Sequence, residues 1–215
     1  MSEKRNRVQF DEATHTYTVN GTEYPSVTQI IRFLSYDQSK CADQQMALIA
    51  RERGTEVHEA AALYDYSGDI AEDLSADASP YLSAYVQFCR DYKPKWNYIE
   101  HVLGANREGI PYGYCGTLDR AGFIDGKFCI LDIKTSYKVN IPSLSAQLAA
   151  YDNLLKFQHT ELYKEDTDLY GLQLMRTGKY RLYKVDYQQG IKLLKGCFDI
   201  HKQLEAMKGV RYAIK

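Results

Sequence analysis

The sequence lacks the features of several protein classes. No stretch approaches the roughly 18 consecutive apolar residues of a membrane-spanning helix, so no membrane span is expected. The N-terminal segment MSEKRNRVQFDE carries basic residues with no apolar run behind them and does not resemble a signal peptide. The 5 cysteines include no C-x-x-C pair and fit neither a disulfide framework nor a zinc or iron–sulfur ligand set. We therefore expect a reducing, cytoplasmic location.

Features that would divide the chain are also scarce. With 5 prolines in 215 residues, no internal repeat and no linker rich in Pro, Gly or Ser, we expect a single domain over residues 1–215. The net charge of −1 argues against a protein whose whole surface binds nucleic acid, although it is compatible with one basic groove. Tyrosine is abundant, with 19 residues, which suits partly exposed strands or, alternatively, stacking surfaces.

The residue pattern predicts an α/β fold of the mixed α+β kind, with a central mixed β-sheet flanked by helices and a β-hairpin region near the N-terminus. Asn20–Gly21 is typical of a two-residue turn between strands at 16–19 and 22–24. Helices are expected at residues 25–34, 42–66 with an interruption near Gly54, 79–92, 143–157 and 188–207. Further strands are expected at residues 98–103, 116–124, 127–134, 168–176 and 180–186.

The most informative segment is YCGTLDRAGFIDGKFCILDIKTS, residues 114–136. Asp125–Gly126 is a strong signal for a two-residue hairpin turn. If these residues form the turn, Asp119 lies directly opposite Asp132, because both are equally far from it. By the same count Thr117 faces Lys134. The alternation of side chains along a strand then places all four on one face of the hairpin.

Two carboxylates that face each other next to an apolar surface need a cation between them, because like charges at opposed positions are destabilising. A divalent metal supplies that charge, and all-oxygen ligation favours a hard ion such as Mg²⁺ or Mn²⁺. The alternative is an exposed hairpin, or a register altered by a bulge, in which the two carboxylates never meet.

Four motifs in order along the chain resemble those of a known nuclease superfamily. Asp119 followed by D-I-K at 132–134 resembles the PD-(D/E)XK nucleases. R-G-T-E-V-H at 53–58 and Q-L-A-A-Y at 147–151 are similar to motifs of the RecB-like and lambda-exonuclease-like branch. Residues 15–31, HTYTVNGTEYPSVTQII, resemble the N-terminal region of its phage-type exonucleases. The resemblance implies a restriction-endonuclease-like core.

The chain departs from the pattern of this superfamily in three ways. Leu118 precedes Asp119 where many members have proline, and Asp132 stands where many have glutamate. The four spaced cysteines of members with an iron–sulfur cluster are missing, so we expect no cluster.

The resemblance also implies roles for particular residues. His58, Asp119, Asp132 and the Ile133 carbonyl would hold one or two Mg²⁺ or Mn²⁺ ions, which activate the attacking water. Lys134 would position or deprotonate that water, or neutralise the phosphate. Without the motif around it, a lone histidine on a helix would more often be structural.

Three further residues are candidates for the site. Gln147 and Tyr151 are four positions apart on one helix face, so they can point at one site and orient Lys134 and the DNA backbone. Without the resemblance they would be read as an ordinary core-edge pair. Glu100 lies on a strand where related enzymes often carry an acid, and it is a further candidate metal ligand. The alternative for Glu100 is a surface acid on an edge strand.

These expectations together describe a metal-dependent DNA exonuclease that hydrolyses phosphodiester bonds in DNA recombination, repair or phage DNA processing. The alternatives are a structure-specific endonuclease and a non-catalytic nucleic-acid-binding module that retains the fold. DNA is the expected partner. The resemblance also raises a homo-oligomeric ring and a single-strand annealing or recombination partner protein.

Overall fold

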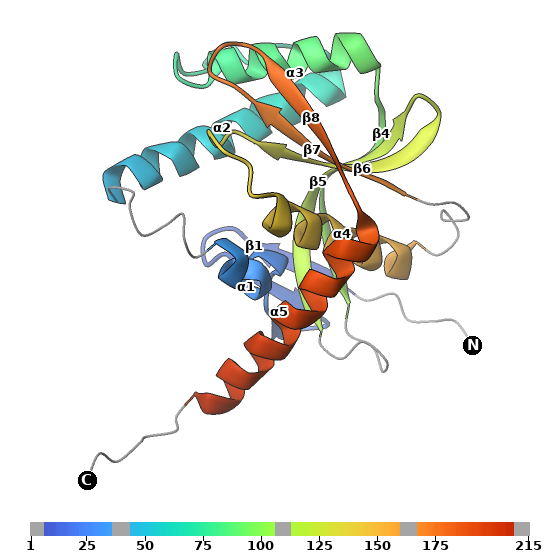
Figure 1. Cartoon of the computed structure of the whole chain (residues 1–215). Helices are drawn as coiled ribbons and strands as arrows, with labels where there is room; N and C mark the ends of the chain where they lie inside the picture. The colour runs from blue at the N-terminus through green and yellow to red at the C-terminus, as the bar shows by residue number, and fades with distance from the viewer. Residues whose placement is uncertain (1–6, 36–43, 106–112, 160–166, 209–215) are drawn as a thin grey trace.

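Two β-sheets and five α-helices make up the part of the chain that the computed structural model describes, which is residues 7–35, 44–105, 113–159 and 167–208 (Figure 1). None of the helices in these ranges is long and apolar enough to cross a membrane. Four of the cysteines are free thiols: Cys89, Cys115, Cys129 and Cys197. The fifth, Cys41, lies outside the described residues.

The N-terminal sheet is antiparallel, with the order β1 (Val8–Asp11), β2 (Thr16–Val19) and β3 (Thr22–Tyr24). Asn20 and Gly21 have φ values of 53° and 81°, as a turn with two left-handed residues requires. The predicted hairpin is therefore confirmed, and β1 adds a third strand to it.

The first two helical segments follow this sheet. Helix α1 (Val27–Ile31) begins at Ser26, whose side chain and that of Gln29 form a reciprocal capping box, and it continues as the 3-10 turn η1 (Arg32–Ser35). Helix α2 (Gln44–Ser67) is continuous, so the interruption expected near Gly54 is wrong. One glycine costs a helix only about 1 kcal/mol, and the residues before it are good helix formers.

The central sheet has the strand order β4-β5-β6-β7-β8. Its strands are β4 (Lys95–Ala105), β5 (Tyr114–Ile124), β6 (Lys127–Lys134), β7 (Asp168–Leu174) and β8 (Tyr180–Val185). Strands β6 and β7 are parallel and are joined through helix α4 (Ile141–Gln158), whereas the other neighbours are antiparallel. The mixed sheet of the predicted α+β class is confirmed.

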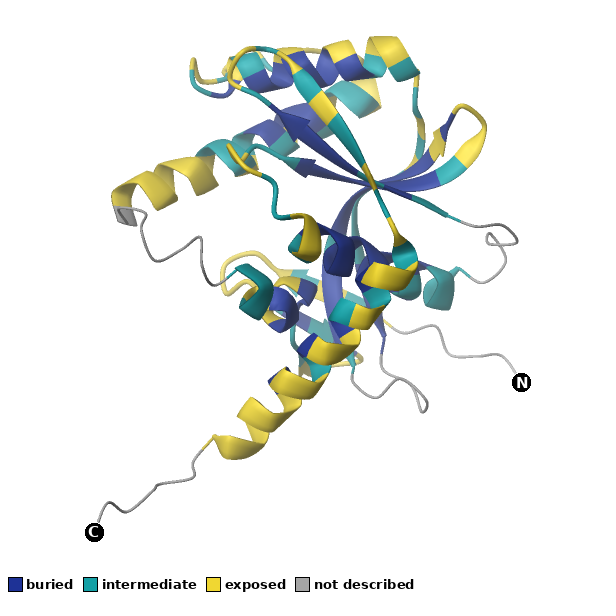
Figure 2. Cartoon of the chain, viewed as in Figure 1, coloured by how far each residue is buried: buried dark blue, intermediate teal, exposed yellow. Residues whose placement is uncertain are grey.

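Helices cover both faces of this sheet (Figures 1 and 2). Helix α4 packs on one face, together with α1 and α5 (Tyr187–Met207), over a core that includes Ala121 and Ile130. Helices α2 and α3 (Ser79–Tyr92) cover the other face, over a core that includes Leu131 and Ile133. Neighbouring residues of β6 therefore belong to opposite cores, as the alternation of side chains along a strand requires.

One helix start agrees with the expected one and another differs. Helix α3 begins at Ser79 as expected, with Ala78 as its N-cap and Pro80 in its first turn. Helix α4 begins two residues earlier than expected, because the side chain of Asn140 caps it by accepting a hydrogen bond from the Ser143 N–H at 3.1 Å. The predicted end of α3 is correct, since Lys93 adopts the left-handed conformation with φ 46°.

The contact between α4 and α5 depends on a glycine, and this can be tested. A Cβ atom at Gly190 would clash with the main-chain carbonyl of Ser145, so Gly190→Ala should lower the free energy of unfolding by about 1–3 kcal/mol. Gly196 lies on the same helix with open space around it, so Gly196→Ala should raise stability by about 0.5–1 kcal/mol. Urea unfolding of both variants checks the pair, and shifts of equal sign would contradict this account of the contact.

Candidate active site

Strands β5 and β6 form the predicted hairpin. Their ladder pairs residues 120–124 with residues 127–131 in the expected register. Asp125 and Gly126 have φ values of 50° and 76°, so they form the expected turn. The turn signal in the sequence was therefore sufficient to set the register near the turn.

Farther from the turn the predicted ladder between β5 and β6 does not continue. Pairing of β5 with β6 ends at Arg120, whereas β5 stays paired with β4 as far as Tyr114, so Asp119 is not a ladder partner of Asp132. Instead, the Asp119 Oδ2 atom accepts a hydrogen bond from the Ile133 N–H at 2.6 Å. A side-chain oxygen thus replaces the main-chain acceptor at this point. The expected opposition of Thr117 and Lys134 is absent from the ladder for the same reason.

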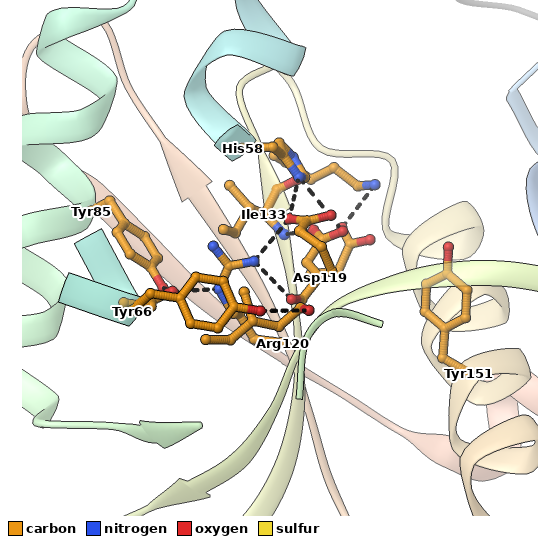
Figure 3. A network of polar contacts seen from close by, with 12 residues as sticks. His58, Tyr66, Tyr85, Asp119, Arg120, Ile133 and Tyr151 are labelled. Atoms are coloured by element: carbon orange, nitrogen blue, oxygen red, sulfur yellow. Dashed lines mark hydrogen bonds and ion pairs between the residues drawn. The ribbon is translucent and has the colours of Figure 1, made fainter. Parts of the chain in front are cut away.

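Three side chains from different elements converge here, and Asp119 is one of them (Figure 3). His58 of α2 has its Nδ1 atom 3.4 Å from Glu100 Oε1 and 3.6 Å from Asp119 Oδ1. Its Nε2 atom lies 3.3 Å from the Ile133 carbonyl oxygen. One ligand atom each from His58, Glu100 and Asp119 lies within 4.8 Å of the other two, so these residues could hold a metal ion.

Glu100 reaches this group through an unusual backbone conformation. Its φ is 45°, in the left-handed region that non-glycine residues rarely adopt. It has no partner in the ladder between β4 and β5, although Ile99 and His101 on either side of it are paired. Backbone strain of this kind persists where surrounding contacts hold it, and it is frequent at functional sites.

The contacts that hold Glu100 come from Arg120, a residue that the sequence analysis missed. Arg120 is 0% exposed, and its Nη1 atom donates to Glu100 Oε1 at 2.8 Å and to the Asp119 main-chain oxygen at 2.7 Å. Its Nε atom donates to Asp65 of α2, which also accepts a hydrogen bond from the Tyr85 hydroxyl at 2.7 Å. The sequence did contain a signal for this role, because Arg120 lies in a largely apolar strand and a buried arginine needs a charged partner.

A second group extends from the first toward α4. Lys134 Nζ lies 2.8 Å from Asp132 Oδ2 and donates a hydrogen bond to Gln147 Oε1 at 3.0 Å. Gln147 Nε2 in turn donates to the Tyr151 hydroxyl at 3.2 Å. Gln147 therefore contacts Lys134 directly, and Tyr151 reaches it only through Gln147. Asp132 faces Lys134 and does not belong to the three-residue group around His58.

Burial and charge act in opposite directions on the acid–base groups of the site. Burial raises the pKa of Asp119 to about 7, although His58 acts to lower it. Burial would lower the pKa of His58, but Asp119 and Glu100 outweigh it and raise that pKa to about 9. Burial would raise the pKa of Glu100, but its hydrogen bond with His58 lowers it. Without a metal, the positive charge of the site is therefore a proton on His58.

Lys134 is also charged at neutral pH. Burial would lower the pKa of its ammonium group, but the carboxylates of Asp132 and Asp119 outweigh this effect and raise it. The second group is therefore a fixed cation beside the candidate metal ligands.

The donor set near His58 suits a hard or borderline divalent cation. Two carboxylates and the nearby Ile133 carbonyl supply the oxygen ligands that Mg²⁺ and Mn²⁺ prefer, and the imidazole is compatible with Mn²⁺. Every residue predicted for the site lies in one of the two groups: His58, Glu100, Asp119, Ile133, and then Asp132, Lys134, Gln147 and Tyr151.

Comparison with known proteins gives matches among solved structures. No protein-family model and no curated protein matches the chain. A crystal structure of a "putative exonuclease" from Eubacterium rectale is similar, with a TM-score of 0.55 and 12% identity, over 87% of this chain and 83% of that one. A chain named SSO0001 matches over 80% of this chain and 84% of its own, at 12% identity, but its TM-score of 0.33 carries no argument.

At 12% identity, the likeness to the Eubacterium rectale protein concerns the fold alone. Together with the mixed sheet and the helices on both faces, it shows that the two proteins share a mixed α+β core.

The charge of His58 predicts a pH dependence of stability in the absence of metal. Its folded pKa of about 9 is raised from 6.5, so its contribution to the free energy of unfolding is fully present below about pH 6.5 and is lost as pH rises through 9. The loss should be on the order of 2 kcal/mol. Asp119 acts in the same direction over a lower pH range, since its pKa is also raised.

Urea unfolding in EDTA between about pH 6.5 and pH 9.5 measures this dependence. The wild type should lose stability across the range, and His58→Gln should show a clearly smaller loss because it has no proton to release. Equal losses of stability in the two proteins would show that Asp119 and Glu100 do not raise the pKa of His58.

Proposed function

We propose that this chain is a metal-dependent deoxyribonuclease that hydrolyses phosphodiester bonds, and that it acts as an exonuclease. The observation that carries the proposal is the convergence of His58, Glu100 and Asp119 beside a lysine that is itself held in place. A group of potential metal ligands next to a fixed cation matches what phosphodiester hydrolysis requires, because charge develops on the phosphate and the leaving oxygen.

A divalent ion, Mg²⁺ or Mn²⁺, bound by His58, Glu100 and Asp119 would supply Lewis acidity and lower the pKa of a bound water. The Ile133 carbonyl lies beside the same group, at 3.3 Å from the imidazole, and can serve as a further ligand. Asp132 keeps Lys134 in position and is available to a second ion. The proposal includes no iron–sulfur cluster.

Lys134 is best suited to neutralise charge on the phosphate. Its pKa is raised, so its ammonium group keeps its proton at neutral pH and is a poor general base. The Gln147 oxygen at 3.0 Å and the Asp132 carboxylate at 2.8 Å hold the Nζ atom in place. Tyr151 fixes the Gln147 amide in turn. This arrangement positions a charge before the substrate arrives, which is where electrostatic stabilisation is most effective.

The preference for an exonuclease rests on the motifs of residues 15–151, which resemble phage-type exonucleases, and on the name of the Eubacterium rectale neighbour. We propose that the chain acts as one nuclease domain on DNA. A ring of several copies and a recombination partner protein follow from the resemblance alone.

Removal of Lys134 should separate chemistry from folding. Lys134→Ala should lower the rate of DNA degradation by roughly 10²-fold or more, because a charge-stabilising group is lost. Lys156→Ala is the matched control. Lys156 of α4 also forms an ion pair at 2.8 Å with a buried aspartate, Asp152, but it belongs to neither group of the candidate site. The control should keep wild-type activity. Full activity in Lys134→Ala would contradict the proposed role.

The form of the substrate separates the candidate functions. The wild type should degrade end-labelled linear DNA in Mg²⁺ or Mn²⁺, leave closed circles intact and be inactive in EDTA. Cutting of circles would instead indicate an endonuclease. Binding of DNA without cutting in either metal would indicate a non-catalytic module.

A further inference from the structure

A row of polar side chains crosses the sheet from the candidate site to the edge strand. Lys134 of β6 pairs with Gln173 of β7, and Gln173 pairs with Arg181 of β8. Since adjacent strands lie 4.7–4.9 Å apart, the main chain at Arg181 is about 10 Å from that at Lys134. The row faces α4, because residues an even number of positions away on the same strands pack in the core beneath that helix: Ile130, Leu169 and Tyr183.

The segment that follows Lys134 is fixed against this row. The Gln173 Nε2 atom donates hydrogen bonds to the main-chain oxygens of Ser136 and Tyr137, both at 2.9 Å. Gln173 is 4% exposed, and its Oε1 atom accepts a hydrogen bond from the Tyr183 hydroxyl at 3.0 Å. A buried side chain with its own partner thus holds two consecutive carbonyl groups, so the main chain beside Lys134 is ordered in advance.

This fixed main chain presents an aromatic ring to solvent. Tyr137 has a relative exposure of 102%, and within the described residues its side chain has no hydrogen bond or ring contact. The loop between β6 and α4 that carries it is exposed on the surface (Figure 2). A free aromatic face on an ordered backbone is what stacking on a planar ligand requires, since little flexibility is lost on binding.

The far end of the row carries an available positive charge. Arg181 is exposed, and its Nη1 atom donates to the Tyr183 hydroxyl at 3.3 Å. Within the described part of the chain no carboxylate forms an ion pair with it. The tyrosine contact orients the guanidinium but does not neutralise it, so it can bind an anion such as a phosphate.

We propose that Tyr137 and Arg181 form a nucleotide subsite next to Lys134, in which Tyr137 stacks on an unpaired base and Arg181 binds a phosphate of the same strand. The inference rests on the proposed nuclease function and narrows its substrate. Bases inside a duplex are already stacked on both faces, so the subsite selects single-stranded DNA or the frayed end of a duplex. A dinucleotide can span the distance between Lys134 and Arg181.

Binding of a fluorescein-labelled single-stranded oligodeoxynucleotide, measured by anisotropy in EDTA, tests the subsite without cleavage. Tyr137→Ala should weaken binding about tenfold, and Tyr137→Phe should bind as the wild type does because it keeps the ring. Neither change removes the main-chain carbonyl that Gln173 holds. An oligonucleotide with abasic positions throughout should bind equally to the wild type and to Tyr137→Ala.

Arg181→Gln should weaken binding severalfold and reduce the slope of log affinity against log salt by roughly 0.7, as expected for one lost phosphate contact on a single strand. Lys184→Gln is the matched control. Lys184 lies on the same strand but on the opposite face, where it pairs with Asp168 at 2.7 Å, so this variant should keep the affinity and salt slope of the wild type.

The outcomes distinguish the subsite from the nuclease. Wild-type affinity in both Tyr137→Ala and Arg181→Gln, with the wild type degrading DNA, would overturn the subsite and leave the proposed function intact. A loss in Tyr137→Phe as large as in Tyr137→Ala would overturn stacking as the contact. A wild type that neither binds nor degrades DNA in Mg²⁺ or Mn²⁺ would overturn the proposed function and the subsite with it.

Discussion

The buried positive charge of Arg120 is the constraint on which the candidate site depends. Removing an arginine from water costs several kcal/mol unless opposite charges compensate for it. Asp65 and Glu100 supply those charges, and Arg120 thereby joins α2, β4 and β5. Asp119 precedes Arg120, so its side chain lies on the opposite face of the strand, and its main-chain carbonyl accepts a hydrogen bond from the guanidinium. The contacts of Arg120 therefore hold two of the candidate ligands, Glu100 and Asp119.

The carboxylates of the site are divided between two tasks. Glu100 and Asp119 face His58, whose raised pKa shows how strongly they favour a positive charge between them. Asp132 forms an ion pair with Lys134. One part of the candidate site could hold a cation, and the other carries the ammonium group of Lys134. A phosphate that contacts both would meet positive charge on two sides, although the chain as a whole has a net charge of −1.

Local signals in the sequence were sufficient for much of the fold. The Asp125–Gly126 turn and the alternation on its two strands gave the hairpin and its register over residues 120–131, because these depend on neighbours along the chain. The end of this ladder at Arg120 could not be predicted, since beyond it β5 pairs only with β4 and β6 only with β7, both distant in the chain. The similarity of short motifs selected the candidate site residues, and the structure brings them together.

Other features had no local signal. Asp65 and Arg120 are 55 positions apart, and their contact depends on the packing of α2 against the sheet at β4. The left-handed conformation of Glu100 likewise had no local signal, because the position has no glycine or asparagine and its carboxylate is held by the distant Arg120. Gly54 gave a misleading signal, since a single glycine does not end a helix whose neighbours on both sides favour it.

The two groups of the site belong to different layers of the molecule. His58 is carried by the helix that covers one face of the sheet, whereas Gln147 and Tyr151 are carried by the helix that covers the opposite face. The distance between the candidate metal ligands and Lys134 is therefore not fixed within any one element, but depends on how the helices of both layers pack on the sheet. A small shift of either layer would change the distance between the two groups of the site without breaking the contacts inside each group. The geometry of such a site is more sensitive to heat and to distant core substitutions than the fold itself, and it should be lost before the protein unfolds.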